Sequence, residues 1–300
     1  MKKILGYIVG YVKAADKPLF LLSSFFIALL VFINYHFGLN KYLVSLSYPA
    51  QYLGWYFVFL AAFSFAYIAW SVKNGKRLFR QAGFVFLLLT APAVFSWKMV
   101  YDPEFLFSED PVQNTYWNAV IYWPFKLAVI AALLWLIWRL RRDGPSFYGL
   151  SFHRFDAKPY WIMLLLMVPL VAWASTQPDF LAIYPKLKNL AYLRNEENST
   201  WYKLLYELSY GSDFIGIELF FRGFLVLAFV RYAGSDAILP MALFYCTIHF
   251  GKPLGECISS YFGGLLLGIV TFHTRTIAGG LMVHLGIAWM MELGGYLGRM

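Results

Sequence analysis

The chain has 300 residues, of which 60% are hydrophobic, 21% are aromatic and only 14% are charged. A soluble domain carries about a quarter charged residues, so this composition excludes an ordinary soluble fold and indicates a protein whose solvent is the lipid bilayer. The formal net charge of +9 does not indicate a nucleic-acid partner. The Lys and Arg residues stand in short clusters between apolar runs, which is typical of the cytoplasmic loops of membrane proteins.

The first 17 residues combine a basic start with an apolar stretch that Tyr7, Tyr11 and Lys13 interrupt. No small-residue cleavage site follows, so the segment does not have the pattern of a signal peptide. We expect residues 1–17 to form an interfacial helix that lies on the membrane surface.

A helix that spans a bilayer needs about 20 mostly apolar residues. Five such runs are predicted in the first part of the chain, at 19–38, 50–72, 82–99, 116–138 and 159–175. Four less uniformly apolar runs follow, at 213–232, 236–250, 257–274 and 277–295. The sequence therefore predicts an all-α fold, a polytopic transmembrane helical bundle of eight or nine spans.

The charges between these runs predict the orientation. Basic clusters follow the second and fourth runs: Lys73, Lys76, Arg77, Arg80, Arg139, Arg141 and Arg142. The loop after the third run instead carries Asp102, Glu104, Glu109 and Asp110. By the positive-inside rule the N-terminus is cytoplasmic. Compact loops without an organelle-targeting signal favour a multi-pass protein of a bacterial inner membrane.

The last third of the chain places ionisable residues inside its apolar helices. Glu218 and Arg222 stand four residues apart, so they share one helix face. His249 follows Tyr245 by one turn, and His284 lies within the last predicted span. An ionisable group at membrane depth costs a few kcal/mol, so these residues indicate either a functional site or a buried ion pair.

These residues resemble a known pattern, in which a Glu-xxx-Arg-Gly helix is followed by an aromatic-xxx-His segment, a Gly-rich helix and a His-xxx-small helix. The order is similar to that of the CPBP family, also called Abi, of type II CAAX prenyl proteases and bacteriocin-processing or self-immunity proteins. The resemblance covers residues 205–295 as a core domain. Residues 18–175 are then accessory transmembrane helices, and residues 176–204 form an amphipathic polar connection.

The resemblance implies helices that enclose an intramembrane cavity and an endopeptidase activity on a protein or peptide near the membrane surface, with no cofactor required. Against the family motifs EExxxR, FxxxH and HxxxN, the chain carries Ile217, Glu218 and Arg222, then Tyr245 and His249, then His284 and Ala288. Ile217 replaces the glutamate that the family uses, with the histidine of its second motif, to activate water. Ala288 replaces an amide that helps to stabilise the oxyanion.

Attack by water on a peptide needs a general base within hydrogen-bonding reach, which Ile217 does not supply. Glu218 is our preferred base, although Arg222 one turn away makes it a weaker one. Glu292, which shares a helix face with His284, is the second candidate for the base. Asp213 and Glu256, which lie at helix ends, are further candidates. We expect the catalytic residues to be Glu218, His249 and His284, with Arg222, Tyr245, Glu256 and Glu292 in support.

Two other functions and a metal-binding version of the site are alternatives. Ile217 and Ala288 favour a catalytically altered relative that acts as a membrane scaffold, a bacteriocin immunity protein or a partner-binding protein. A transporter is less favoured, because the sequence has no inverted repeat. The chain also lacks the HExxH, GxSG-like and GxGD motifs of other membrane proteases. Glu218, His249 and His284 form a weak alternative set for a divalent metal.

Two smaller features indicate packing rather than chemistry. Gly264 and Gly268 have the small-xxx-small spacing of closely packed helices. Cys246 and Cys257 lie in apolar surroundings without the spacing of a zinc site or a disulfide framework.

Overall fold

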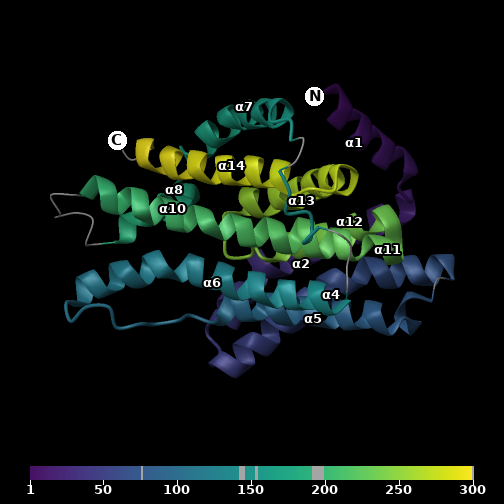
Figure 1. Ribbon diagram of the computed structural model, residues 1–300, viewed down its shortest axis with the longest axis horizontal. Coiled ribbons are helices and arrows are strands. Elements are labelled where there is room, and N and C mark those ends of the chain that lie inside the picture. Colours follow the sequence, from purple (N-terminus) through teal and green to yellow (C-terminus); the bar gives the residue numbers. More distant parts are fainter. Residues whose placement is uncertain (76, 142–145, 153–154, 191–198, 299–300) are drawn as a thin grey trace.

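The computed structural model describes residues 1–75, 77–141, 146–152, 155–190 and 199–298. All the regular elements in these ranges are helices, which confirms the predicted all-α fold (Figure 1).

The first part of the chain contains a helix at each of the five predicted apolar runs, a helix within the predicted N-terminal segment, and two short helices that were not predicted. They are α1 (Lys2–Ala14), α2 (Lys17–Phe37), α3 (Leu39–Val44), α4 (Tyr48–Asn74), η1 (Leu78–Arg80), α5 (Ala82–Val100), α6 (Pro111–Arg141) and α7 (Lys158–Ala174). Local signals set their ends. Asp16 caps α2, because its Oδ1 accepts a hydrogen bond from the backbone N–H of Leu19 at 3.2 Å. Gly38 and Gly75 end α2 and α4 in the left-handed conformation that glycine adopts without strain.

The second part is more interrupted. It contains α8 (Pro178–Ile183), η2 (Lys186–Asn189), α10 (Ser199–Glu218), the π-helix η3 (Leu219–Ala228), α11 (Val230–Ala233), η4 (Gly234–Ala237), α12 (Ile238–Thr247), α13 (Leu254–Thr274) and α14 (Ala278–Leu297). The helix predicted at 213–232 is the continuation of one that already begins at Ser199. The amphipathic stretch before it is therefore the first half of the helix that carries Glu218, and residues 191–198 of the predicted connection lie outside the described residues.

Five of the described helices are long and apolar enough to cross a membrane: α2, α4, α5, α6 and α13. This count supports a multi-pass membrane protein, but it does not confirm eight or nine spans. α12 has only 10 residues, which at 1.5 Å per residue cover about half of the ~30 Å hydrocarbon core. The segment predicted as a span at 236–250 therefore ends early, and His249 lies in the turn that follows it.

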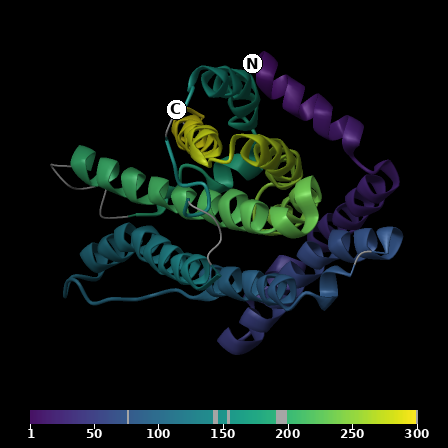
Figure 2. The same cartoon turned by 45° about the vertical axis from the view of Figure 1, so that its right-hand side comes forward.

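Several long helices, among them α14, α10, α6, α4 and α5, run in similar directions and form stacked layers (Figure 1). From top to bottom in Figure 1, α7 covers α14, α14 packs on α10, and α10 packs on α6, with α4 and α5 beyond (Figures 1 and 2). α12 packs against α13 and α4. At the α12–α13 contact a Cβ on Gly264 would lie 3.4 Å from the Cα of Ala242, so the close packing predicted from the glycine spacing is confirmed.

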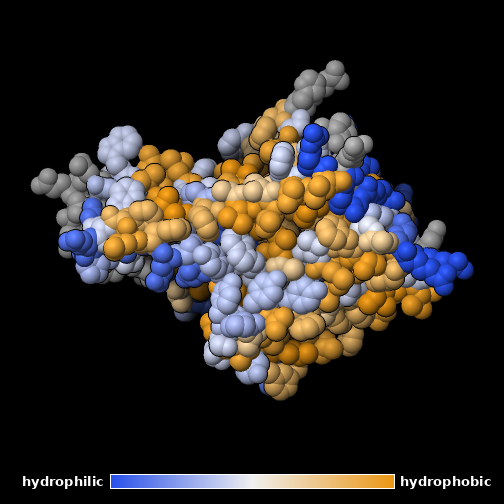
Figure 3. All heavy atoms as spheres, turned by 60° about the horizontal axis from the view of Figure 1, so that its bottom comes forward, coloured by the Kyte–Doolittle hydropathy of each residue, from blue (hydrophilic) through white to orange (hydrophobic). Residues whose placement is uncertain are grey.

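The outer surface is apolar over a broad band, as a lipid-facing surface must be. Large side chains such as Phe25, Phe57, Leu165 and Trp173 are exposed on it. Figure 3 shows this apolar surface on one face of the molecule, with the most hydrophilic residues at its right-hand end, where α4 ends and α5 begins. Lys73, at that end of α4, forms an ion pair of 2.5 Å with Asp16.

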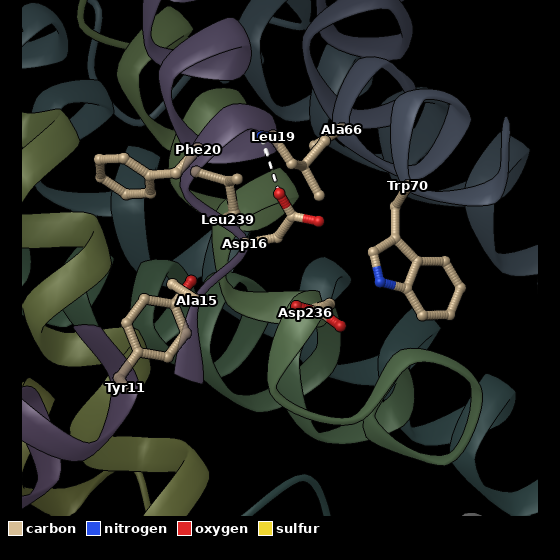
Figure 4. A pocket seen from close by; sticks show the side chains of 9 residues that line it. All are labelled: Tyr11, Ala15, Asp16, Leu19, Phe20, Ala66, Trp70, Asp236 and Leu239. Atoms are coloured by element: carbon tan, nitrogen blue, oxygen red, sulfur yellow. Dashed lines mark hydrogen bonds between the residues drawn. The ribbon is translucent and has the colours of Figure 1, made fainter. Parts of the chain in front are cut away.

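A small hollow lies where α1 meets α2, and it is lined by Tyr11, Asp16, Trp70 and Asp236 among others (Figure 4). Its volume of about 10 Å³ leaves room for a single water molecule and for no larger ligand. The hollow is a joint between helices and is not a substrate site.

Candidate active site

Glu218 and Arg222 occupy the junction between α10 and η3. Glu218 is the last residue of α10, and η3 begins directly after it. Both side chains are fully buried, and Arg222 Nη1 lies 3.0 Å from Glu218 Oε1. The pair that the four-residue spacing predicted is therefore formed. Each charge needs the other, because an uncompensated buried charge is strongly destabilising.

Gly280 at the start of α14 lets this carboxylate approach the last helix. A Cβ at position 280 would collide with Glu218 Oε2. The same Oε2 has no hydrogen-bond partner among the described residues. The sequence indicated only close approach or flexibility at Gly280, whereas the structure shows that this glycine makes room for the buried carboxylate.

His284 joins Glu218 to Tyr245. Its Nδ1 lies 2.9 Å from Glu218 Oε1, and its Nε2 lies 3.0 Å from the Tyr245 hydroxyl. A carboxylate only accepts hydrogen bonds, so Nδ1 carries the proton, and in the neutral ring Nε2 accepts from the phenol. The Glu218 side chain is fully buried, whereas the His284 side chain is 16% exposed. The hydrogen bond between them therefore connects the protein interior to a partly exposed imidazole.

The Tyr245 ring is clamped between neighbours. The Arg222 guanidinium lies 4.0 Å from the ring centroid, and the Phe221 ring meets it edge-on at 5.0 Å. On another side, a Cβ on Gly264 would lie 3.1 Å from Tyr245 Cδ1, so the backbone of α13 lies against the ring. These contacts fix the direction of the hydroxyl and place a cation against the aromatic face.

His249 lies in the turn after α12, and its Nδ1 is 2.9 Å from the backbone carbonyl oxygen of Tyr245. The carbonyl accepts, so Nδ1 carries the proton and Nε2 keeps a lone pair. Nε2 makes no hydrogen bond within the described part of the chain, and the residue is partly exposed. The geometry thus holds an unprotonated imidazole nitrogen ready to accept a proton.

The first half of the chain fixes this turn. The Tyr35 hydroxyl of α2 donates to the carbonyl of Lys252 at 2.6 Å, and Asn34 Nδ2 donates to the carbonyl of Phe250 at 2.9 Å. The N-terminal helices therefore do more than anchor the protein, because one of them positions the turn that carries His249.

Glu256 belongs to a second polar group that includes an unpredicted tyrosine. Lys252 Nζ lies 3.4 Å from Glu256 Oε1 and donates to the Tyr184 hydroxyl at 2.8 Å. Tyr184 in turn donates to Glu256, with an O···O distance of 3.1 Å. Burial, followed by the nearby Glu256 carboxylate, raises the pKa of Tyr184. Tyr184 comes from the loop after α8, where no sequence pattern marks it.

Glu292 is bound by the same loop. Its Oε2 accepts the backbone N–H of Lys186 at 2.8 Å, and its carboxyl interacts with that of Glu207 on α10. Burial and the neighbouring Lys252 cation lower the pKa of Lys186 to about 8. Glu292 therefore accepts a hydrogen bond from the backbone of Lys186, whereas His284 is hydrogen-bonded to Glu218.

Each of the remaining candidate residues either forms an ion pair or has an apolar side chain. Asp213 forms an ion pair of 2.7 Å with Lys98 of α5. Ile217 is buried in the main apolar core, and Ala288 packs near Tyr210 and Phe214. Neither position provides a proton acceptor or donor from its side chain.

A metal site finds little support in this arrangement. The described ranges contain no group of three or more His, Cys, Asp or Glu side chains that converge as ligands. Glu218 and His284 contact each other directly, with His284 Nδ1 at 2.9 Å from Glu218 Oε1. The three residues considered from the sequence therefore do not form a ligand set.

Comparison with known proteins agrees with the sequence motifs. Residues 208–290 match the family model Rce1-like, described as type II CAAX prenyl endopeptidase Rce1-like. The match confirms the resemblance to CPBP-type intramembrane proteases over this range, which includes Glu218, Arg222, Tyr245, His249 and His284. No curated protein and no solved structure matches the chain.

Proposed function

We propose that this chain, whose residues 208–290 form an Rce1-like domain of the CPBP type, is a membrane endopeptidase in which His249 activates the attacking water. One observation carries the proposal. His249 donates from Nδ1 to a backbone carbonyl, so Nε2 is held as an unprotonated base in a partly exposed turn and makes no hydrogen bond with any residue that the structure describes. General-base catalysis needs such a nitrogen within hydrogen-bonding reach of water.

In the proposed reaction, Nε2 of His249 removes a proton from water as the water oxygen attacks the peptide carbonyl carbon. The imidazolium that forms needs a counter-charge. Burial lowers the pKa of His249 to about 4, and the Glu256 carboxylate is the charged group that opposes this shift most strongly. We therefore assign Glu256, at the start of α13, the role of stabilising the imidazolium.

Glu218 has a different role in this proposal from the one that the sequence favoured. Its Oε1 is already shared by Arg222 and His284, and its side chain is fully buried. A general base must come within hydrogen-bonding reach of the attacking water, and this carboxylate is fully buried. Glu218 instead holds His284 in the tautomer whose Nε2 faces Tyr245.

The location of the site among apolar helices supports a substrate at the membrane. The site is built by an Rce1-like domain whose helices pack among apolar, membrane-crossing ones. The proposed substrate is a protein or peptide at the bilayer, cleaved near the membrane surface.

The test uses the purified full-length protein in proteoliposomes with a library of prenylated and unprenylated peptides, and mass spectrometry of the products. We expect the wild type to cleave at least one class and His249→Gln to lose cleavage by about 10²–10⁴-fold, the usual contribution of a general base. His273→Gln is the matched control, because His273 stacks on Tyr7 at the other end of α13. Full activity of His249→Gln would refute the proposal.

The buried apolar residues Ile217 and Ala288 favour a second candidate, a relative that binds a polypeptide in this site without cleaving it. Under that alternative the wild type retains peptides in a pull-down but releases no fragments. Restoring the family residues with Ile217→Glu and Ala288→Asn separates the two candidates, because a dormant protease gains cleavage and a binding protein does not.

A further inference from the structure

Tyr245 contacts both histidines of the site. Its hydroxyl lies 3.0 Å from His284 Nε2, and its backbone carbonyl accepts from His249 Nδ1 at 2.9 Å. The side chain and the main chain of one residue therefore connect the proposed base His249 to a second imidazole, His284, which accepts no proton from the attacking water.

The hydrogen-bond directions form a series from Glu218 through His284 to the Tyr245 hydroxyl. Glu218 accepts from Nδ1 of His284 at 2.9 Å, so a positive charge on the ring is stabilised by a carboxylate in direct contact. Carboxylate, imidazole and hydroxyl in this order make the hydroxyl proton mobile. When His284 is protonated, its Nε2–H donates to the phenol oxygen, and the phenol proton is then available to another acceptor.

Arg222 places a positive charge beside the ring, which offsets part of the cost of charging a buried phenol. The guanidinium of Arg222 lies 4.0 Å from the ring centroid, and His284 borders the oxygen. Two groups that carry or accept positive charge thus lie against Tyr245. Phe221 and Gly264 hold the ring in place, so no reorganisation is needed when charge develops.

Given the proposed function, on which this inference rests, we infer that Tyr245 is the general acid of the site and protonates the leaving amine. His249 Nε2 takes a proton as the water oxygen bonds to the carbonyl carbon, and the carbonyl electron pair moves to its oxygen. That pair then re-forms the carbonyl as the C–N bond breaks, and the amine nitrogen takes the proton of the Tyr245 hydroxyl. In the reacting form His284 is protonated at both ring nitrogens, so its Nε2–H protonates the phenolate, and the proton that His249 took from water then passes through solvent to restore His284.

The test compares two substrates in the full-length protein. One is a cleaved peptide, and the other is the same sequence with an ester oxygen at the scissile nitrogen, whose leaving group needs much less protonation. We expect Tyr245→Phe to lower cleavage of the peptide by about 10²–10⁴-fold, the range for a general acid, and cleavage of the ester by less than tenfold. Tyr261→Phe is the matched control, because its hydroxyl bonds to Ser24 away from the site.

Each outcome decides between the possibilities. An equal loss on peptide and ester, or full peptide cleavage by Tyr245→Phe, overturns the inference while the proposed function stands. A wild type that cleaves neither substrate overturns the proposed function itself. A fluorinated tyrosine at position 245 guards against misfolding of the Phe variant, because it keeps the hydroxyl and makes it more acidic. It is expected to shift the pH profile of peptide cleavage and to leave that of the ester unchanged, and an unshifted peptide profile counts against the inference.

Discussion

Arg222 is fully buried against Glu218, and replacing it with methionine tests whether that contact is an ion pair. Methionine fills a similar volume without charge, so the variant leaves the Glu218 carboxylate with one fewer counter-charge in a site with no exposed surface. Breaking a buried pair from one side costs about 3–5 kcal/mol. His284 Nδ1 still donates a hydrogen bond to Glu218 Oε1 in the variant, so we expect a value near the lower limit.

The measurement is the free energy of unfolding in detergent or bicelles for the wild type, Arg222→Met, Glu218→Gln and the double variant. A buried pair replaced on both sides is often close to neutral, so the double variant is expected to be more stable than Arg222→Met alone. Phe221→Leu is a neighbouring control that changes packing without charge. A stability of Arg222→Met within about 0.5 kcal/mol of the wild type would refute the reasoning, because the Glu218 carboxyl would then not depend on Arg222.

Three further predictions concern the surroundings of the site. Gly280→Ala is expected to cost about 1–3 kcal/mol of stability through overpacking and to lower peptidase activity, because the new Cβ collides with Glu218 Oε2. Gly263→Ala is the control, because its Cβ meets no atom within 4 Å. This control is expected to leave both thermal stability and cleavage unchanged. Asn34→Ala leaves the carbonyl of Phe250 without its donor and is expected to cost about 1–3 kcal/mol in chemical denaturation; an unchanged stability would mean that α2 does not hold the His249 turn. Lys186→Met keeps the backbone contact to Glu292 and removes a cation whose pKa is lowered to about 8. In the wild type the charged form of Lys186 lowers the stability of the fold fully below pH 8, and this penalty fades as the pH rises towards 10.5. The variant should therefore melt at a higher temperature than the wild type at pH 7 and by a smaller margin at pH 10, and a margin that grows with pH contradicts this sign.

The parts of the site that lie on one helix could be predicted from the sequence. Glu218 and Arg222 share a face because they stand four residues apart, and the packing at Gly264 and Gly268 followed from their spacing. Local periodicity fixes such neighbours before any tertiary contact forms. Helix existence was predicted for the same reason, since apolar runs of this length are helical in lipid.

The contacts between helices could not be predicted, because a sequence does not give the depth and rotation of one helix against another. The bond between Glu218 and His284 depends on how close α14 comes to α10, which Gly280 permits. Tyr184 lies in the loop after α8 and Lys186 is the first residue of the short helix η2, where no apolar period marks either of them. The span count failed to be confirmed for a related reason, since α12 ends after 10 residues, before the apolar pattern does.

The most direct test of the central claim is cleavage in water enriched in ¹⁸O by the full-length wild type and by His249→Ala. If His249 activates water, the wild type forms a new carboxyl terminus that carries one ¹⁸O atom from solvent, and the variant forms no such product above the uncatalysed level. A wild type that releases no labelled fragment, or a His249→Ala variant that forms it at the wild-type rate, would contradict the assignment of this site as a water-activating endopeptidase centre.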